Sequence, residues 1–249
     1  MTEILLKAKN LCKHFGALQV CRNFNLQIER GELHALIGPN GAGKTTALNL
    51  LTGLLTPDSG TLFLNDLDIT KTSVNKRARL GLARAFQVTS LFNSFSVLEN
   101  LMLAVQAQQG TGFHFWSNAS HDRKLVASAT TFVERMGLLD RSTVLAGNLS
   151  HGERRQLEMG MALATKPSML LLDEPMAGLG PGGTLKLSEL IDSLKGEVTI
   201  LMVEHDTHAV FALADRISVL VQGEVVATDT PKMIKENKLV QEAYLGGAK

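Results

Sequence analysis

A glycine-rich loop, Gly38-Pro-Asn-Gly-Ala-Gly-Lys-Thr45, has the composition of a phosphate-binding turn of the Walker A type. Its glycines let the backbone curl tightly and direct successive N–H groups toward an anion. Lys44 supplies a point charge for the β- and γ-phosphates, and the Thr45 hydroxyl is placed for Mg²⁺. The loop therefore predicts ATP binding with Mg²⁺, through Gly38, Asn40, Gly41, Ala42, Gly43, Lys44, Thr45 and Thr46.

Two carboxylates follow an apolar run in Leu170-Leu-Leu-Asp-Glu-Pro175. Such a run is typical of a buried strand, which places Asp173 at the carboxyl edge of a sheet, where ligands of open α/β sheets bind. Asp173 can then hold the Mg²⁺ shell, and Glu174 can polarise an attacking water. An acidic strand end alone is commonly just a turn, so the glycine loop upstream is what favours the catalytic interpretation.

A second helix start carries a hydroxyl, in Leu149-Ser150-His151-Gly152-Glu153. The N–H groups of a helix N-terminus can bind an anion. Read alone, Ser150 is an ordinary N-cap. Its position about twenty residues before the Asp-Glu pair favours a functional interpretation.

The elements that must position these residues alternate between strands and helices. The run Leu33–Ile37 predicts a buried strand directly before the glycine loop, and a helix follows from about residue 44 to 55. Residues 4–37 read as short strands. Further strands are expected at Met169–Leu172 and Val198–Val203, with helices at about 181–195 and 207–213, a hairpin across Gln222-Gly223 and a helical C-terminus. This order predicts an α/β P-loop core, a mixed sheet flanked by helices plus N-terminal antiparallel strands.

The stretch from about 88 to 165 has a different, mostly helical character. Ser96 begins one helix, with Glu99 in the position of a capping box, and two more are expected at 123–138 and 150–165. A Gln/Gly/Ser/Asn-rich segment at 106–122 separates them. We therefore expect one domain, 1–249, with an α/β core at 1–87 and 166–249 and an inserted helical lobe at 88–165.

Composition excludes several classes of protein. The formal net charge is +1 and there is no basic run of five or more residues, so nucleic acid is not an expected partner. The longest apolar runs fall well short of the roughly 20 residues that span a bilayer. The N-terminus lacks the features of a secretory signal. Cys12 and Cys21 do not form a zinc motif, and a reducing cytoplasm is the expected compartment.

The order of these motifs resembles the nucleotide-binding subunits of ABC transporters over essentially the whole chain. The resemblance also includes Gln87 in Ala85-Phe-Gln-Val-Thr-Ser-Leu-Phe92 and His205 in Val203-Glu-His-Asp206. More narrowly, the chain resembles the branched-chain amino acid transporter ATPases. The features behind this are the Val-Glu-His-Asp motif, Ala177-Gly-Leu, the aromatic insertion at 106–122 and the ending Ala243-Tyr-Leu-Gly246.

The resemblance implies a role for each matching position. Phe15 would stack on adenine, and Gln87 would complete the Mg²⁺ shell with Thr45 and Asp173. His205 would bind the γ-phosphate and orient the water, so the implied catalytic residues are Glu174, His205 and Lys44. The residues that would bind ATP in trans, from a second ATP-binding subunit, are Ser150, His151, Gly152 and Glu153.

The resemblance also implies partners and a location. Two transmembrane permease subunits would be driven by the ATPase pair, and an extracytoplasmic solute-binding protein would be involved indirectly. The chain would lie peripherally on the cytoplasmic face of the inner membrane. Apolar residues that would form either the permease groove or the core of the lobe itself are Leu91, Phe92, Phe95 and Val97.

Three positions depart from the usual family pattern. His151 replaces a glycine of Leu-Ser-Gly-Gly-Gln, Glu153 replaces its glutamine, and Gly180 replaces the aspartate of Ser-Ala-Leu-Asp. Glu153 adds negative charge near the expected γ-phosphate, which would weaken the contact there unless Arg154 or Arg155 offsets the charge. A soluble ABC-type ATPase in a non-transport complex, such as iron–sulfur cluster assembly, shares every nucleotide motif and remains the alternative.

Overall fold

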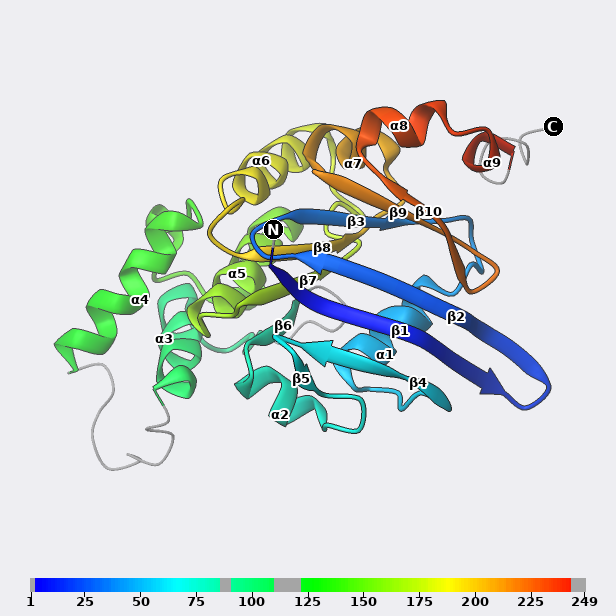
Figure 1. Ribbon diagram of the computed structural model, residues 1–249. Coiled ribbons are helices and arrows are strands. Elements are labelled where there is room, and N and C mark those ends of the chain that lie inside the picture. The colour runs from blue at the N-terminus through cyan, green and yellow to red at the C-terminus, as the bar shows by residue number, and fades with distance from the viewer. Residues whose placement is uncertain (1–2, 86–90, 110–121, 243–249) are drawn as a thin grey trace.

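The structure is a computed structural model that describes residues 3–85, 91–109 and 122–242 (Figure 1). It has the α/β architecture expected from the sequence, with a mixed sheet, helices around it and an N-terminal antiparallel sheet. Within the described residues, no helix combines the length and apolar character needed to cross a bilayer.

The mixed sheet has strand order β10-β9-β3-β8-β7-β6 and is parallel except for the β9–β10 pair. The expected hairpin across Gln222 and Gly223 is confirmed, and both residues have positive φ, as tight hairpin turns require. The strands are β3 (Leu33–Ile37), β6 (Leu82–Ala85), β7 (Met169–Asp173), β8 (Thr199–Val203), β9 (Arg216–Val221) and β10 (Glu224–Asp229).

The antiparallel sheet has order β2-β1-β4-β5. The expectation of short strands over residues 4–37 is wrong, because β1 and β2 each continue for 12 residues. Asn10 and Asn23 have positive φ where the ladder shifts register, and these bulges interrupt the alternation without ending the strands. The strands are β1 (Ile4–Phe15), β2 (Leu18–Glu29), β4 (Ser59–Leu64) and β5 (Leu67–Asp68).

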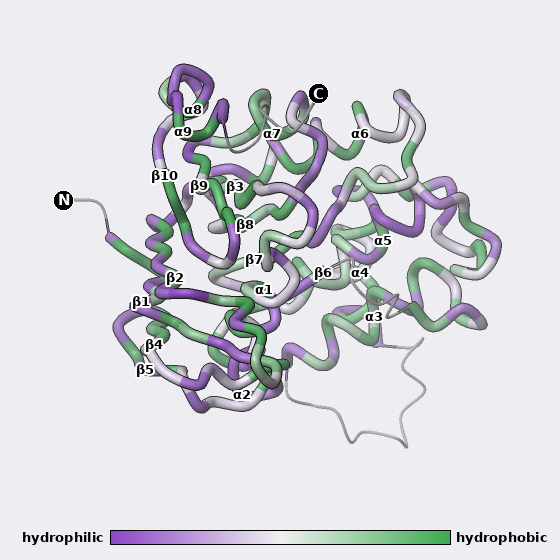
Figure 2. Tube along the Cα trace, turned by 90° about the vertical axis from the view of Figure 1, so that its right-hand side faces the viewer, coloured by the Kyte–Doolittle hydropathy of each residue, from purple (hydrophilic) through white to green (hydrophobic). Residues whose placement is uncertain are grey.

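The central strands separate two hydrophobic cores. In β8, Ile200 and Met202 pack in the core shared with the helices, whereas Leu201 and Val203 pack in the core beneath the antiparallel sheet. Successive side chains of a strand point to opposite faces, so a strand covered on both faces reads as a continuous apolar run. Figure 2 shows β8 mostly in green for this reason.

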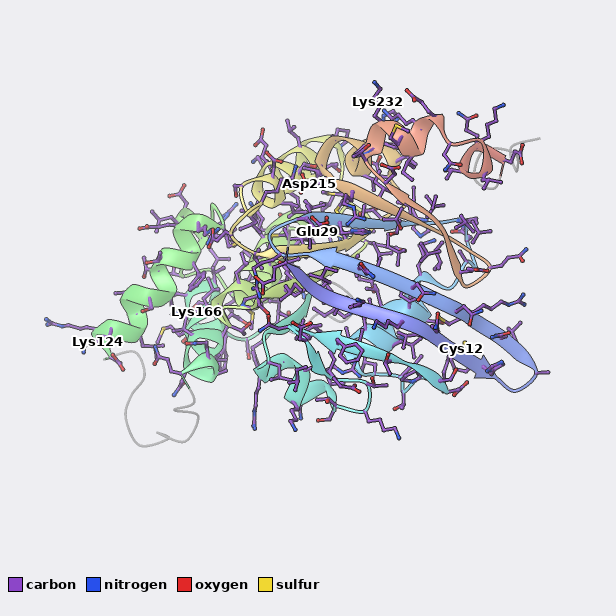
Figure 3. All side chains as sticks on the ribbon, viewed as in Figure 1. Cys12, Glu29, Lys124, Lys166, Asp215 and Lys232 are labelled. Carbon is purple, nitrogen blue, oxygen red and sulfur yellow. The ribbon has the colours of Figure 1, made fainter. Side chains whose placement is uncertain are left out.

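Helices α3, α4 and α5 pack together at one end of the molecule, away from the antiparallel sheet (Figure 1). The capping box of Ser96 and Glu99 at the start of α3 is confirmed. Lys124, at the exposed tip of α4, lies at the opposite end of the molecule from Lys232 on α8 (Figure 3). The helices are α1 (Lys44–Thr52), α2 (Val74–Arg79), α3 (Val97–Gln108), α4 (Arg123–Arg135), α5 (His151–Ala164), α6 (Pro181–Asp192), α7 (Thr207–Leu213), α8 (Pro231–Glu236) and α9 (Lys238–Val240).

Candidate active site

The predicted catalytic residues meet at the carboxyl ends of three neighbouring parallel strands. β8 lies between β3 and β7, and Val203 pairs with Leu36 on one side and Asp173 on the other. The glycine loop leaves β3 at this edge, and the polar residues of the other two strands follow β7 and β8. This is the edge at which open α/β sheets bind ligands.

Close backbone packing explains the glycines of the loop. A Cβ atom on Gly38 would lie 2.2 Å from the carbonyl oxygen of Leu220, and one on Gly43 would lie 2.8 Å from that of Val20. Gly41 has open space around it, but its φ of 78° is in the left-handed region that favours glycine. The loop therefore keeps its shape only with these small residues.

Lys44 lies inside the loop that it follows. Its Nζ atom donates to the carbonyl oxygens of Gly38 (2.7 Å) and Pro39 (3.0 Å). Burial lowers the pKa of Lys44, and the charge of Glu174 acts in the opposite direction. The lysine thus holds the loop in shape. Around it, Ala42 is buried, Thr46 is half-buried, and Asn40, Gly41 and Thr45 are exposed.

Asp173 is held by an arginine from the adjacent strand. Arg84 on β6 donates to Asp173 Oδ2 at 2.7 Å and to Asn49 Oδ1 on α1 at 2.8 Å, and the Arg84 and Asp173 side chains are each 12% exposed. Arg84 thereby ties the helix after the glycine loop to the end of β7. Together with the Thr45 hydroxyl, the carboxylate of Asp173 offers the oxygen donors that Mg²⁺ prefers, so these residues fit that ion.

Glu174 and His205 form a direct pair. His205 Nε2 lies 2.8 Å from Glu174 Oε1, and both side chains are more than a third exposed. Glu174 has a φ of 50°, and its backbone N–H donates to the Val203 carbonyl at 2.8 Å. The left-handed turn aims a carboxylate from the end of β7 at an imidazole from the end of β8.

Phe15 lies at the tip of the β1–β2 hairpin, opposite Leu18, and is 48% exposed. The same hairpin approaches the glycine loop through the Val20 carbonyl, which faces Gly43. An exposed aromatic ring on this hairpin is free to stack on a base. Gln87 lies outside the described residues.

The second helix start has a complete capping box. Ser150 Oγ accepts from the Glu153 N–H at 3.3 Å, and Glu153 Oε2 accepts from the Ser150 N–H at 2.8 Å. The charge of Glu153 is offset by an arginine outside the motif, because Arg141 Nε donates to Glu153 Oε1 at 2.8 Å. The hydrogen bonds from Ser150, with the guanidinium of Arg141, lower the pKa of Glu153.

The unusual residues at 151 and 180 lie in one cavity. His151 is the first residue of α5, so it takes an ordinary helical conformation without strain. Its Nε2 lies 3.2 Å from the Ala177 carbonyl oxygen. His151 and Gly180 both line a cavity of about 380 Å³ with Ser150 and Gly152. Among the described residues, no hydrogen bond or ion pair links this helix start to the glycine loop of the same chain.

A larger groove of about 1010 Å³ lies between the helices α3 and α5 and the α2–β6 part of the core. Lys166, at its rim, lies between the helical end and the sheets (Figure 3). The four apolar residues predicted to form either the permease groove or the core of the helical lobe differ in burial. Leu91 and Val97 are buried, whereas Phe92 (52% exposed) stacks on Phe95 (39% exposed), and Leu91 and Phe92 line the groove.

Sequence reasoning missed three side chains that hold the site together: Arg84, Arg141 and Glu204. Arg84 belongs to a short strand that the apolar pattern does not reveal, and its partner Asp173 is 89 positions away. Arg141 ends a short 3-10 helix, Leu139–Arg141, outside any motif. Glu204 stands in the Val-Glu-His-Asp motif, but only its buried position in the structure distinguishes it from a solvent-exposed acid.

Comparison with known proteins agrees with this geometry. Residues 21–177 match the family model described as ABC transporter. The chain is 41% identical over 255 residues to the high-affinity branched-chain amino acid transport ATP-binding protein LivG of Escherichia coli (strain K12), with 100% of both chains covered. It is 37% identical to BraF of Pseudomonas aeruginosa, again with 100% of both covered.

More distant relatives extend the comparison. The lipopolysaccharide export system ATP-binding protein LptB of E. coli (strain K12) is 32% identical, with 97% of each chain covered. A crystal structure of the ADP conformation of an ATP-binding cassette of an ABC transporter is 28% identical, with a TM-score of 0.86 over 98% of this chain and 100% of that one. The chain, an ATP-binding and ATP-hydrolysing cassette, therefore belongs to the ABC transporter family.

Proposed function

We propose that this chain is the ATP-hydrolysing subunit of an importer for branched-chain or related amino acids. The names of LivG and BraF state branched-chain amino acid transport for those relatives, and this chain covers both along their full length. The observation that carries the hydrolytic role is the Glu174–His205 pair beside the glycine loop. These two side chains face the edge where the loop would hold a γ-phosphate.

In this proposal the residues at the carboxyl ends of β3, β7 and β8 have distinct roles. Lys44 and the N–H groups of the loop bind the phosphates, and Phe15 stacks on adenine. Bound Mg²⁺ supplies positive charge at the phosphates, and its protein ligands would be Thr45, Gln87 and Asp173. Glu174 orients and polarises the attacking water, and His205 bonds the γ-phosphate, as positioned groups do in phosphoryl transfer.

We further propose that two ATP-binding subunits, identical or paralogous, pair head to tail. Among the described residues, the start of α5 makes no hydrogen bond or ion pair with the glycine loop of its own chain, so this helix start would serve a nucleotide held by a second chain. Pairing would surround each γ-phosphate with donors from two helix starts and exclude water. Ser150, His151, Gly152 and Glu153 would form the part contributed in trans.

The groove between α3, α5 and β6 is the proposed docking surface for two transmembrane permease subunits. Phe92 lines the groove, is exposed and stacks on the exposed Phe95, so this ring pair supplies apolar contact area. Arg84 lines this groove and also holds Asp173, so docking and nucleotide binding share one side chain. The ATPase would then lie peripherally on the cytoplasmic face of the membrane, with a solute-binding protein acting from the far side.

Uptake of radiolabelled leucine tests the proposal in cells from which the chain has been deleted. The wild-type chain is expected to restore uptake and to copurify from detergent-solubilised membranes with two polytopic subunits. Glu174→Gln is expected to copurify equally well without restoring uptake. A consistently cytosolic complex would instead support the iron–sulfur type of role, and export of labelled lipid would support a function like that stated by the name of LptB.

A further inference from the structure

Glu204 is a buried acid between β8 and His205, and its side chain binds only backbone groups among the described residues. It is 3% exposed. Its Oε1 atom accepts from the Met176 N–H at 2.7 Å. Its Oε2 atom accepts from the N–H groups of His205 at 2.8 Å and Asp206 at 3.2 Å. One carboxylate therefore satisfies three backbone donors from two separate segments.

These two segments are the ones that carry the reacting pair. Met176 is two residues beyond Glu174, and His205 is itself one of the donors. On its other side, Glu174 is anchored by its own N–H to the Val203 carbonyl at 2.8 Å. The left-handed turn at Glu174, with φ of 50°, is thus fastened at both ends to the strand end that carries His205.

The chemistry requires an acid at this position. Buried backbone N–H groups need acceptors, and a carboxylate presents one at each of its two oxygens. A glutamine of the same length has one acceptor oxygen, and its NH₂ group would face an N–H group on the other side. Its oxygen can accept either from the Met176 N–H or from the N–H groups of His205 and Asp206, but not from both segments.

We propose that Glu204 is a positioning residue for ATP hydrolysis, because its carboxylate sets the separation of Glu174 from His205. The proposal rests on the roles given above to those two residues. Glu204 is not expected to touch ATP. Its effect acts through the alignment of the water-activating carboxylate with the imidazole, where a misplacement of about 1 Å can cost about 100-fold in rate.

Steady-state ATP hydrolysis by the purified full-length chain tests this with Glu204→Gln. We expect kcat to fall about 10- to 100-fold while KM for ATP stays within about twofold of the wild-type value. The matched control is Glu32→Gln. Glu32 is also buried, at 8% exposure, and binds a backbone N–H and His34, but it lies at the opposite, amino-terminal end of β3. It is expected to lose stability with unchanged kcat.

Glu204→Asp is a second test variant. The aspartate keeps the negative charge, but its side chain is one methylene shorter and is expected not to reach both segments. It is expected to lower kcat with KM unchanged, even if Glu204→Gln does not fold. A folded Glu204→Gln or Glu204→Asp variant with wild-type kcat would overturn the proposal, as would a raised KM with kcat intact. Glu174→Gln, measured in parallel, separates the two ideas. If that variant keeps its activity, the proposed role of Glu174 fails and this inference fails with it; if only the Glu204 variants keep theirs, this inference alone fails.

Discussion

The Nε2 atom of His205 lies 2.8 Å from the Oε1 atom of Glu174, although the two residues follow different strands. We expect Glu174→Gln to reduce kcat by about 10²–10⁴-fold, because it removes the proposed base. His205→Ala is expected to cost about 100-fold, because it removes one positioned hydrogen bond. ATP affinity, measured with a fluorescent analogue, is expected to stay within about twofold for Glu174→Gln and to weaken for His205→Ala, which loses the bond to the γ-phosphate.

A variant that combines Glu174→Gln with His205→Ala tests whether the two residues act as a unit. Two residues that act as a unit lose activity non-additively, so Glu174→Gln with His205→Ala is expected to be about as impaired as the worse single variant. His208→Ala is the control, because His208 is exposed on α7, three positions beyond His205. Multiplicative losses in the double variant would show that the two residues act independently.

Phe15→Ala is expected to weaken ATP binding about tenfold, since stacking of a base on an aromatic ring contributes about 1–3 kcal/mol. Phe15→Tyr is expected to retain wild-type affinity. Leu18→Ala removes the exposed neighbour across the hairpin, and affinity is expected to change less than twofold. Titration with ATP and with GTP measures this. Equal losses for Phe15→Ala and Leu18→Ala would point to the shape of the hairpin rather than to stacking.

Arg84→Met is expected to lower the free energy of unfolding by about 3 kcal/mol, because it leaves Asp173 charged and poorly hydrated. Adding Asp173→Asn is expected to recover part of that loss without recovering activity. Urea denaturation measures both. Arg135→Met, which removes an exposed pair with Glu197, is expected to cost less than about 1 kcal/mol. An equal cost for the two arginines would contradict the structural importance of the Arg84–Asp173 pair.

Glu153→Gln installs the residue usual in the family and removes the charge that Arg141 and Ser150 stabilise. The folded-state pKa of Glu153 lies below its ordinary value of 4.5, so its contribution is fully present above that pH and is lost as the pH falls through the folded pKa. We expect the variant to be less stable than wild type by about 0.5 kcal/mol at neutral pH. The difference in free energy of unfolding between wild type and variant, measured by urea denaturation, should disappear in strong acid. A difference that grows on acidification would contradict the stabilising role of the ionised Glu153.

The sequence predicts the central strands well for a physical reason. β3, β7 and β8 are buried on both faces, so their apolar runs are nearly continuous and easily recognised. β6 is short, contains Arg84 between two alanines and lies at the sheet edge, so its sequence has no apolar run that would predict a strand. The sequence predicts helix over the last twenty residues, and the structure has two short helices there, α8 and α9, separated by Asn237, whose side chain caps α9. Residues 243–249 of that stretch lie outside the described residues.

The predicted chemistry of the site came from single motifs, whereas its contacts depend on strand order. No local pattern shows that β8 lies between β3 and β7, and this placement brings His205 to Glu174. The pairing of Arg141 with Glu153 likewise joins a short 3-10 helix to the start of α5. Such contacts follow from tertiary packing, which the spacing of residues along the chain does not encode.

The place of β8 in the sheet has a consequence for synthesis of the chain on the ribosome. β8 begins at Thr199, after most of the chain has been made, yet it is the strand that joins β3 to β7. A nascent chain that already contains the glycine loop and both carboxylates still lacks the strand that holds them together. ATP binding therefore does not stabilise these early intermediates, and the growing polypeptide exposes the edges of two apolar strands until its last fifth emerges.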